Sequence, residues 1–294
     1  MDRGVMDLAK ARIQFVMAVL LYGTIGPLTR FIHLPSEVIV LVRGSCGALV
    51  VLLYQLAQGR KPDIAAIRDN LGWLLASGVS LGLNWVFLFA AYAHTSVAIA
   101  SLCNYMAPII VIAISPIVFG ERIGPRRLAC IVAALIGIML VSDLPTAVSG
   151  GVDLTGTVLG LAGAIGFVGV VVCNKHIGDV DAFDKVVVQL AISAAVVLPY
   201  VLVTDGTIPI GGADPLSYAL LAMLVLVQTG LAYVFYFGSM GYLPVQEIAL
   251  LGYIEPVVSV LGSALVLNEP LGIAGVVGAT LVIGAAAAGE LIQE

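Results

Sequence analysis

The sequence predicts an all-α integral membrane protein whose ten transmembrane helices form two inverted five-helix repeats around a central cavity. The first observation is composition: 61% of the 294 residues are hydrophobic and 11% are charged, whereas a typical soluble domain has about 25% charged residues. The mean hydropathy is +1.11. The second observation is a series of apolar segments of membrane-spanning length, and the third is a similarity between the two halves of the chain. The lipid bilayer is therefore the first predicted partner.

Apolar runs interrupted by charged residues, glycine and proline define the predicted spans. In the first half they cover residues 12–32, 36–56, 71–93, 96–119 and 125–143. In the second half they cover residues 153–174, 184–204, 216–240, 243–267 and 270–290. A spanning helix needs about 20 mostly apolar residues, so ten spans occupy roughly 200 residues. The connections that remain are short, and we expect no separate soluble domain.

The distribution of basic residues predicts the orientation of these spans. Cytoplasmic loops of membrane proteins carry an excess of Lys and Arg, and a cytoplasmic N-terminus puts 11 of the 13 Lys and Arg residues on that side. They are Arg3, Lys10, Arg12, Arg60, Lys61, Arg68, Arg122, Arg126, Arg127, Lys175 and Lys185. We therefore expect a multi-pass protein of the inner (cytoplasmic) cell membrane with both termini in the cytoplasm. Because this basic charge belongs to loops, nucleic acid is not an expected partner.

The chain repeats itself at an offset of 148 residues. The residues that align at this offset are Tyr105 with Tyr253, Pro108 with Pro256, Glu121 with Glu269 and Gly124 with Gly272. We therefore divide the chain into repeats 1–147 and 148–294. Five spans are an odd number, so the second repeat crosses the membrane in the opposite sense. Inverted repeats are typical of secondary transporters, which bind substrate near the midplane where the repeats meet. The alternative is that duplication merely produced a larger helix bundle without a substrate site between the repeats.

Glu255 is the clearest candidate for a functional residue. Ionisable groups at mid-membrane depth are costly and usually face the interior of the bundle. Pro256 follows directly, and its missing amide weakens the helix and frees a carbonyl. Glu255 could therefore bind a substrate amino group or carry a proton. Alternatively, it caps the broken backbone or pairs with a buried cation.

Polar and aromatic residues at comparable depth supply further candidates for substrate binding. Asn104 and Tyr105 precede Pro108, which is predicted to break its helix as Pro256 does in the second repeat. Asn104 could instead join two helices by hydrogen bonds. Trp85, beside Asn84, and Tyr233 could line an aromatic cavity, although aromatic stripes also face lipid or fill bundle cores. The repeat adds Tyr253 as the counterpart of Tyr105.

Three charged or amide residues near span ends complete the candidate set. Arg43 lies about two turns into its span and needs a partner, for which a substrate carboxylate, Glu37, helix-end carbonyls or a lipid phosphate would serve. It could also extend outward to the interface. Asn174 and Lys175 end their span and could gate the cytoplasmic mouth of the cavity, although Lys175 equally suits a topology signal.

Sequence motifs of other function classes are missing. The chain contains no G-x-x-x-x-G-K-[ST] or H-E-x-x-H motif, which removes the usual support for ATP-driven transport and metalloprotease chemistry. The cysteines lie in apolar stretches without C-x-x-C spacing, so we expect no metal site. Because the motifs above are missing, we also expect no cofactor and no catalytic residue. A membrane-embedded enzyme would need clustered acids or histidines at one interface, and the sequence shows none.

Two stretches in each half resemble the EamA repeat of the drug/metabolite transporter superfamily. The matching segments are residues 95–108, residues 119–123 (Phe-Gly-Glu-Arg-Ile), the region around Pro256 and residues 268–271 (Asn-Glu-Pro-Leu). The resemblance extends over nearly the whole chain and implies a ten-helix exporter of amino acids, related metabolites or drugs.

Within that superfamily, Asn104-Tyr105 and Asn174-Lys175 are similar to segments of aromatic amino acid exporters. This implies that Tyr105, Pro108, Tyr253 and Pro256 lie near a central cavity, with Asn174 and Lys175 toward its cytoplasmic mouth. Glu255 departs from the resemblance, so its coupling to protons is a hypothesis from the residues alone. We expect a secondary transporter that exports amino acids, including aromatic ones, and related small metabolites by alternating access. A passive facilitator or channel on the same fold is the alternative.

Overall fold

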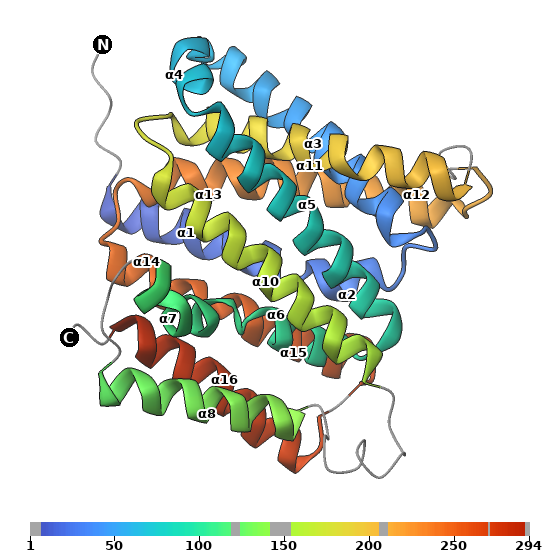
Figure 1. The fold of residues 1–294 in the computed structure, drawn as a ribbon. Helices are drawn as coiled ribbons and strands as arrows, with labels where there is room; N and C mark the ends of the chain where they lie inside the picture. The colour runs from blue at the N-terminus through green and yellow to red at the C-terminus, as the bar shows by residue number, and fades with distance from the viewer. Residues whose placement is uncertain (1–6, 119–123, 142–153, 206–210, 270, 292–294) are drawn as a thin grey trace.

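The computed structural model describes residues 7–118, 124–141, 154–205, 211–269 and 271–291, and within them every regular element is a helix (Figure 1). The helices of the first half are α1 (Leu8–Gly23), α2 (Ile25–Thr29), α3 (Ser36–Ala57), α4 (Ile64–Asp69), α5 (Leu71–His94), α6 (Val97–Asn104), α7 (Ala107–Val118) and α8 (Pro125–Val141). Those of the second half are α10 (Thr155–His176), α11 (Ala182–Asp205), α12 (Pro215–Met223), the π-helix η1 (Leu224–Leu231), α13 (Ala232–Met240), α14 (Val245–Gly252), α15 (Ile254–Val266) and α16 (Ile273–Leu291).

Each predicted span is largely helical over its described residues. Within the described ranges, seven stretches are long and apolar enough to cross a membrane: Leu8–Thr29, Ser36–Ala57, Leu71–His94, Val97–Val118, Thr155–His176, Ala182–Pro199 and Pro215–Met240. Three shorter apolar helices are Leu128–Val141, Ile254–Val266 and Ile273–Ala288. The all-helical membrane fold is thus confirmed, whereas a full crossing by all ten segments stays a prediction. Arg3, Glu121 and Arg122 lie outside the described residues.

Side-chain caps explain where several helices begin. Asp7, Asp63, Ser96 and Asp214 each precede a helix and accept a hydrogen bond from a backbone N–H of its first turn, at 2.9 to 3.3 Å. Such caps satisfy amides that have no partner within the helix. The cap at Asp7 starts α1 four residues before the predicted span, because charged residues of the first turn do not prevent helix formation.

Glycines bring the long helices close together. On α5, a Cβ atom at Gly78 would lie 2.6 Å from Ile192 of α11. On α10, a Cβ atom at Gly160 would lie 2.7 Å from the Cβ atom of Cys103 on α6. Small residues permit this approach between helices in a membrane, where packing must replace the hydrophobic effect. The main neighbours of α5 are therefore α10 and α11, while α8 and α16 pair at the edge of the bundle (Figure 1).

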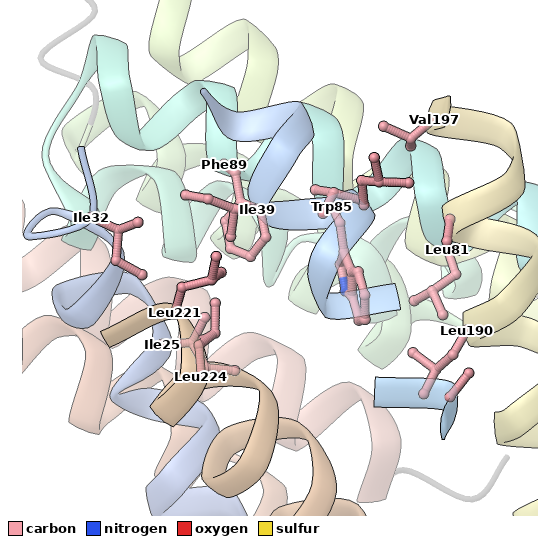
Figure 2. Packing of buried hydrophobic residues seen from close by; sticks show 14 of the residues in the cluster. Ile25, Ile32, Ile39, Leu81, Trp85, Phe89, Leu190, Val197, Leu221 and Leu224 are labelled. Carbon is pink, nitrogen blue, oxygen red and sulfur yellow. The ribbon is translucent and has the colours of Figure 1, made fainter. Parts of the chain in front are cut away.

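The largest core cluster joins helices from both halves of the chain. In Figure 2, Ile25 of α2, Leu81 and Trp85 of α5, and Leu190 of α11 belong to this one buried cluster. The outer surface is apolar as well: Ile117 and Ile273 are each 88% exposed. Helices that are apolar on all sides are typical of membrane spans.

Replacing Gly160 with valine should destabilise the bundle, because the new side chain would overlap α6. Overpacking of this kind costs about 1–3 kcal/mol. Thermal unfolding of the purified protein in detergent measures the effect. Gly72→Val is the matched control, since no atom lies within 4 Å of a Cβ atom at Gly72. Equal unfolding temperatures for the two variants would contradict this packing.

The cap at Asp214 should make stability depend on pH. Hydrogen bonds from His33 and Ser217 hold the pKa of the Asp214 carboxyl group well below its ordinary value. A depressed native pKa means that the carboxylate stabilises the fold above the unfolded pKa of about 4, and that this contribution is lost as the pH falls through the native value.

Asp214→Asn should therefore lower the unfolding temperature at pH 7, and the difference from the unmodified protein should shrink on acidification to about pH 3. Asp179→Asn, at an exposed aspartate between α10 and α11, is the control. A difference between the Asp214 variant and the unmodified protein that does not change with pH would show that the carboxylate has no such role.

Candidate functional site

Three helices break inside the bundle, each three residues before a proline. The breaks lie at Thr24 before Pro27, at Tyr105 before Pro108 and at Tyr253 before Pro256. Proline has no N–H for the carbonyl four residues earlier, and its ring crowds that carbonyl. The chain therefore ends one helix and starts another, with the proline in the new first turn.

This geometry corrects the predicted position of the bends. Pro108 is the second residue of α7 and Pro256 the third residue of α15, so neither proline is itself the break. The residues at the breaks are the tyrosines that align in the two halves. The break at Thr24 was missed, although Pro27 gives the same spacing.

A cavity of about 430 Å³ lies among these broken helices and their neighbours. Its lining residues are Tyr22, Ile25, Arg43, Leu81, Asn84, Trp85, Leu88, Phe89, Tyr92, Asn104, Phe167, Val170, Asn174, Val186, Gln189, Leu190, Tyr233, Tyr236, Phe237, Met240 and Glu255. We call this space the main cavity. Its volume lies in the range of small-molecule sites. Both halves of the chain contribute to its wall.

Most of the predicted substrate-binding residues lie on the wall of the main cavity. They are Arg43, Asn84, Trp85, Asn104, Tyr233 and Glu255, and the predicted gating residue Asn174 joins them. Tyr105 lies beside this cavity rather than on it. Tyr253 packs against a separate apolar cluster that includes Ala107 and Val282, and Lys175 is exposed. A substrate-binding role for Tyr105 or Tyr253 therefore stays a prediction.

Arg43 is 4% exposed and is held in place by two contacts that the sequence did not reveal. Its Nε donates a hydrogen bond of 2.9 Å to the Thr229 hydroxyl. Its guanidinium carbon lies 4.0 Å from the ring centroid of Trp85, a cation–π arrangement. Among the described residues no carboxylate forms an ion pair with it. A guanidinium group has five N–H donors, so it retains capacity for an anion in the cavity.

Thr229, which accepts this hydrogen bond from Arg43, lies in the π-helix η1. Its hydroxyl donates to the carbonyl of Leu224, five residues earlier, at 3.0 Å. Single π-helical turns within α-helices occur frequently at functional sites. The apolar sequence of this span shows no signal for such a turn beyond the polar pair Gln228 and Thr229.

Aromatic rings form one side of the cavity. Tyr22 of α1 lies 5.7 Å from Tyr233 and 5.8 Å from Tyr236 between ring centroids. Phe237 lies 5.1 Å from Tyr236 in an edge-to-face arrangement. These distances suit favourable contacts between rings. Tyr22 was not predicted as a site residue.

Glu255 and the two asparagines are further polar residues on the wall of the main cavity. The side chains of Glu255 and Tyr105 are hydrogen-bonded to each other. Asn84 donates from its amide nitrogen to the Asn104 side-chain oxygen and to the Gly163 carbonyl, each at 2.8 Å. The asparagines therefore join α5, α6 and α10 and also line the main cavity, and a substrate-binding role for Asn104 stays a prediction.

Asn174 belongs to a polar cluster at one end of the cavity. Its side-chain oxygen accepts a hydrogen bond of 2.7 Å from Gln189, which also donates to the Ser77 hydroxyl at 2.6 Å. Gln189 lines the cavity as well and was missed by the sequence reading. A glutamine within an apolar span was the available signal.

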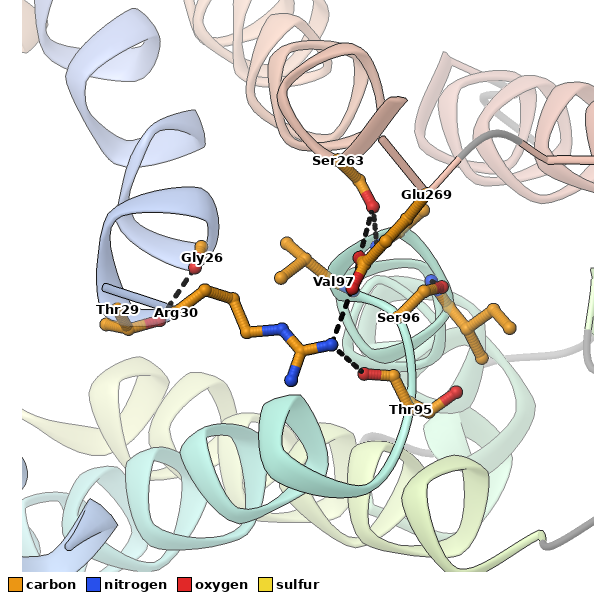
Figure 3. Close-up of polar contacts among 10 residues, drawn as sticks. Gly26, Thr29, Arg30, Thr95, Ser96, Val97, Ser263 and Glu269 are labelled. Atoms are coloured by element: carbon orange, nitrogen blue, oxygen red, sulfur yellow. Dashed lines mark hydrogen bonds and ion pairs between the residues drawn. The ribbon is translucent and has the colours of Figure 1, made fainter. Parts of the chain in front are cut away.

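An ion pair joins the end of α2 to the segment that follows α15 (Figure 3). Arg30, after α2, donates to the Glu269 carboxylate at 2.5 Å. That carboxylate accepts further hydrogen bonds from the Val97 N–H and the Ser263 hydroxyl. It thereby caps α6, where a negative charge is favourable. At the other end of α1, Arg12 forms an ion pair with Glu247 of α14.

Comparison with known proteins agrees with this architecture. The model of the EamA-like transporter family matches residues 10–143 and again residues 154–288. The uncharacterized transporter YxxF of Bacillus subtilis (strain 168) is 26% identical, and the match covers 85% of this chain and 79% of that protein. An uncharacterized transporter of Archaeoglobus fulgidus is 28% identical over 91% of this chain and 92% of its own length.

One further relative matches about half of the chain, and one solved structure matches nearly all of it. The pseudopaline exporter CntI of Pseudomonas aeruginosa is 30% identical over 142 residues, which are 47% of this chain and 48% of that protein. A solved crystal structure at 20% identity has the same fold, with a TM-score of 0.66 over 96% of this chain and 97% of its own. The two family matches cover most of the sequence, and the chain therefore belongs to the EamA-like transporter family and is a multi-pass membrane transporter.

Proposed function

We propose that this protein is a secondary transporter that exports amino acids, including aromatic ones, and related small metabolites. The observation that carries the proposal is that a buried cation, Arg43, and an acid, Glu255, line the same cavity together with aromatic rings. An amino acid at neutral pH carries one carboxylate, one ammonium group and a side chain of variable polarity. The cavity offers a complementary group for each.

Each part of the solute has a proposed partner. The substrate carboxylate binds the guanidinium group of Arg43, since charge-assisted hydrogen bonds to carboxylates are strong. The ammonium group binds Glu255, with Asn104 as a further hydrogen-bonding partner. The side chain packs against Trp85 and Tyr233, whose flat faces suit aromatic groups.

We also propose that ten spans form two inverted repeats, 1–147 and 148–294. The helix breaks at Tyr105 and Tyr253 support this, because they align at the offset of 148 residues. The two separate family matches agree with it. The main cavity then changes its exposure as the halves rock or as the half-helices bend at the breaks. The concentration of Lys and Arg in the loops predicted to be cytoplasmic supports an inner-membrane location with cytoplasmic termini.

Two observations support export as the direction. One matching relative is named a pseudopaline exporter. The segments Asn104-Tyr105 and Asn174-Lys175 resemble the aromatic amino acid exporter YddG. A passive facilitator would use the same cavity but would not accumulate solute against a gradient.

Reconstitution of the purified protein into liposomes tests the proposed function. Uptake of radiolabelled phenylalanine should saturate and should be suppressed by unlabelled aromatic amino acids. Uptake is compared with and without a pH gradient, and empty liposomes give the background. Uptake no greater than this background, for phenylalanine and for other amino acids, would overturn the proposal. Transport that only equilibrates the solute would favour the facilitator.

The carboxylate contact predicts a specific defect in an Arg43 variant. Arg43→Gln should raise the half-saturation concentration for phenylalanine at least about tenfold, because a hydrogen bond to a charged group contributes about 1.5–3 kcal/mol. Arg60→Gln, at an exposed arginine, should leave it unchanged. Phenylalanine methyl ester, which has no carboxylate, should compete poorly with the unmodified protein. Equal inhibition by the ester and the free amino acid would contradict the assignment.

The hypothesis that Glu255 carries a proton has its own test. If it does, a pH gradient should alter uptake by the unmodified protein, and Glu255→Gln should retain transport but lose this dependence. Glu247→Gln is the matched control, because Glu247 pairs with Arg12 away from the cavity. Persistent pH dependence in Glu255→Gln would exclude Glu255 as the proton carrier.

A further inference from the structure

A second, smaller cavity lies where the three helix breaks approach one another. Its volume is about 20 Å³, which is enough for one water-sized species. Its lining residues are Tyr22, Gly23, Gly26, Leu88, Tyr92, Ser101, Asn104, Tyr105, Glu255 and Ser259. We call it the side cavity. Glu255 and Asn104 line both cavities, so any occupant of the side cavity lies next to the solute site.

The polar groups around the side cavity are almost all oxygens. Its side chains supply the hydroxyls of three tyrosines and two serines, an amide and one carboxyl group, whereas no lysine, arginine or histidine lines it. The Ser101 and Ser259 hydroxyl oxygens lie 2.6 Å apart, and the Tyr92 hydroxyl lies 3.3 Å from that of Ser101. Hard cations prefer oxygen ligands of this kind. The single acidic group gives the site a net negative character when ionised.

The break at Thr24 adds backbone to this oxygen-rich wall. Pro27 has no N–H to donate to the carbonyl of Gly23, and Gly23 lines the side cavity. A Cβ atom at Gly23 would lie 2.5 Å from that of Val258. Glycine is therefore what allows the broken end of α1 to reach α15. Carbonyls freed where a helix is discontinuous are recurrent ligands of sodium in transporters.

We propose that the side cavity binds one sodium ion through the Ser101 and Ser259 hydroxyls and the Glu255 carboxylate. Building on the proposed function, we assign this ion a role in transport. Sodium and the ammonium group of the solute compete for the same carboxylate, because a cation bound to Glu255 weakens its attraction for a second one. Competition of this kind couples inward movement of sodium to outward movement of amino acid.

Binding of radiolabelled sodium to the detergent-purified protein tests the site without any solute. The unmodified protein should bind about one ion per chain, displaced by unlabelled sodium but not by choline. The double variant Ser101→Ala with Ser259→Ala should lower this affinity at least tenfold. It should still fold, because it removes both partners of one hydrogen bond together. Ser239→Ala is the control, since the hydroxyl of that buried serine donates to the Phe235 and Tyr236 carbonyls of its own helix, α13.

Two results in this assay would overturn the sodium site. One is the absence of saturable sodium binding to the unmodified protein. The other is equal binding by the double serine variant, which would place the ion elsewhere. Thermal unfolding of each variant, compared with that of Ser239→Ala, separates a lost ligand from a lost fold.

Liposome transport then tests the coupling separately. An opposing sodium gradient should increase phenylalanine accumulation several-fold over an equal choline gradient, and the double serine variant should lose this increase. Sodium binding without amino acid transport would leave the site intact and refute the proposed function instead. Transport driven by protons but indifferent to sodium would overturn the coupling and leave Glu255 as a proton carrier.

Discussion

A backbone that breaks within a membrane must find its hydrogen-bonding partners inside the protein. Lipid offers none, so irregular backbone is tolerated only where protein or a polar cavity surrounds it. The breaks at Thr24, Tyr105 and Tyr253 obey this constraint by lying toward one another. Asn104 and Glu255 lie beside these breaks, whereas the other polar residues of the candidate site come from neighbouring helices. The broken helices therefore supply one part of the polar wall of the cavity.

The sequence revealed the helices and two of the breaks for a physical reason. Apolar segments of spanning length and prolines within them are local features, and local features can be read from one chain. The break at Thr24 was equally local but was missed, since Pro27 lies near the end of its span, where a proline is less conspicuous. The displacement of each break by three residues follows from the carbonyl that a proline leaves without a partner.

Contacts between distant segments were not predictable in the same way. A buried arginine at position 43 clearly required a partner, but its bond to Thr229 joins segments far apart in the chain and is not signalled by composition. Tyr105 and Tyr253 occupy aligned positions, yet one bonds to Glu255 and the other packs in an apolar cluster. Their surroundings differ because the neighbouring helices differ in sequence. Alignment of the halves therefore predicts the backbone better than the roles of side chains.

The stacking of Arg43 on Trp85 has a spectroscopic consequence. The chain contains two tryptophans, and only Trp85 lies on the wall of the main cavity. The other, Trp73, stacks on His176 at 4.5 Å and is 44% exposed. Indole emission depends on neighbouring charge and polarity. Replacing Trp73 with phenylalanine would leave Trp85 as the single indole, and its emission, excited at a wavelength that tyrosine does not absorb, would report occupancy of the cavity without an attached dye.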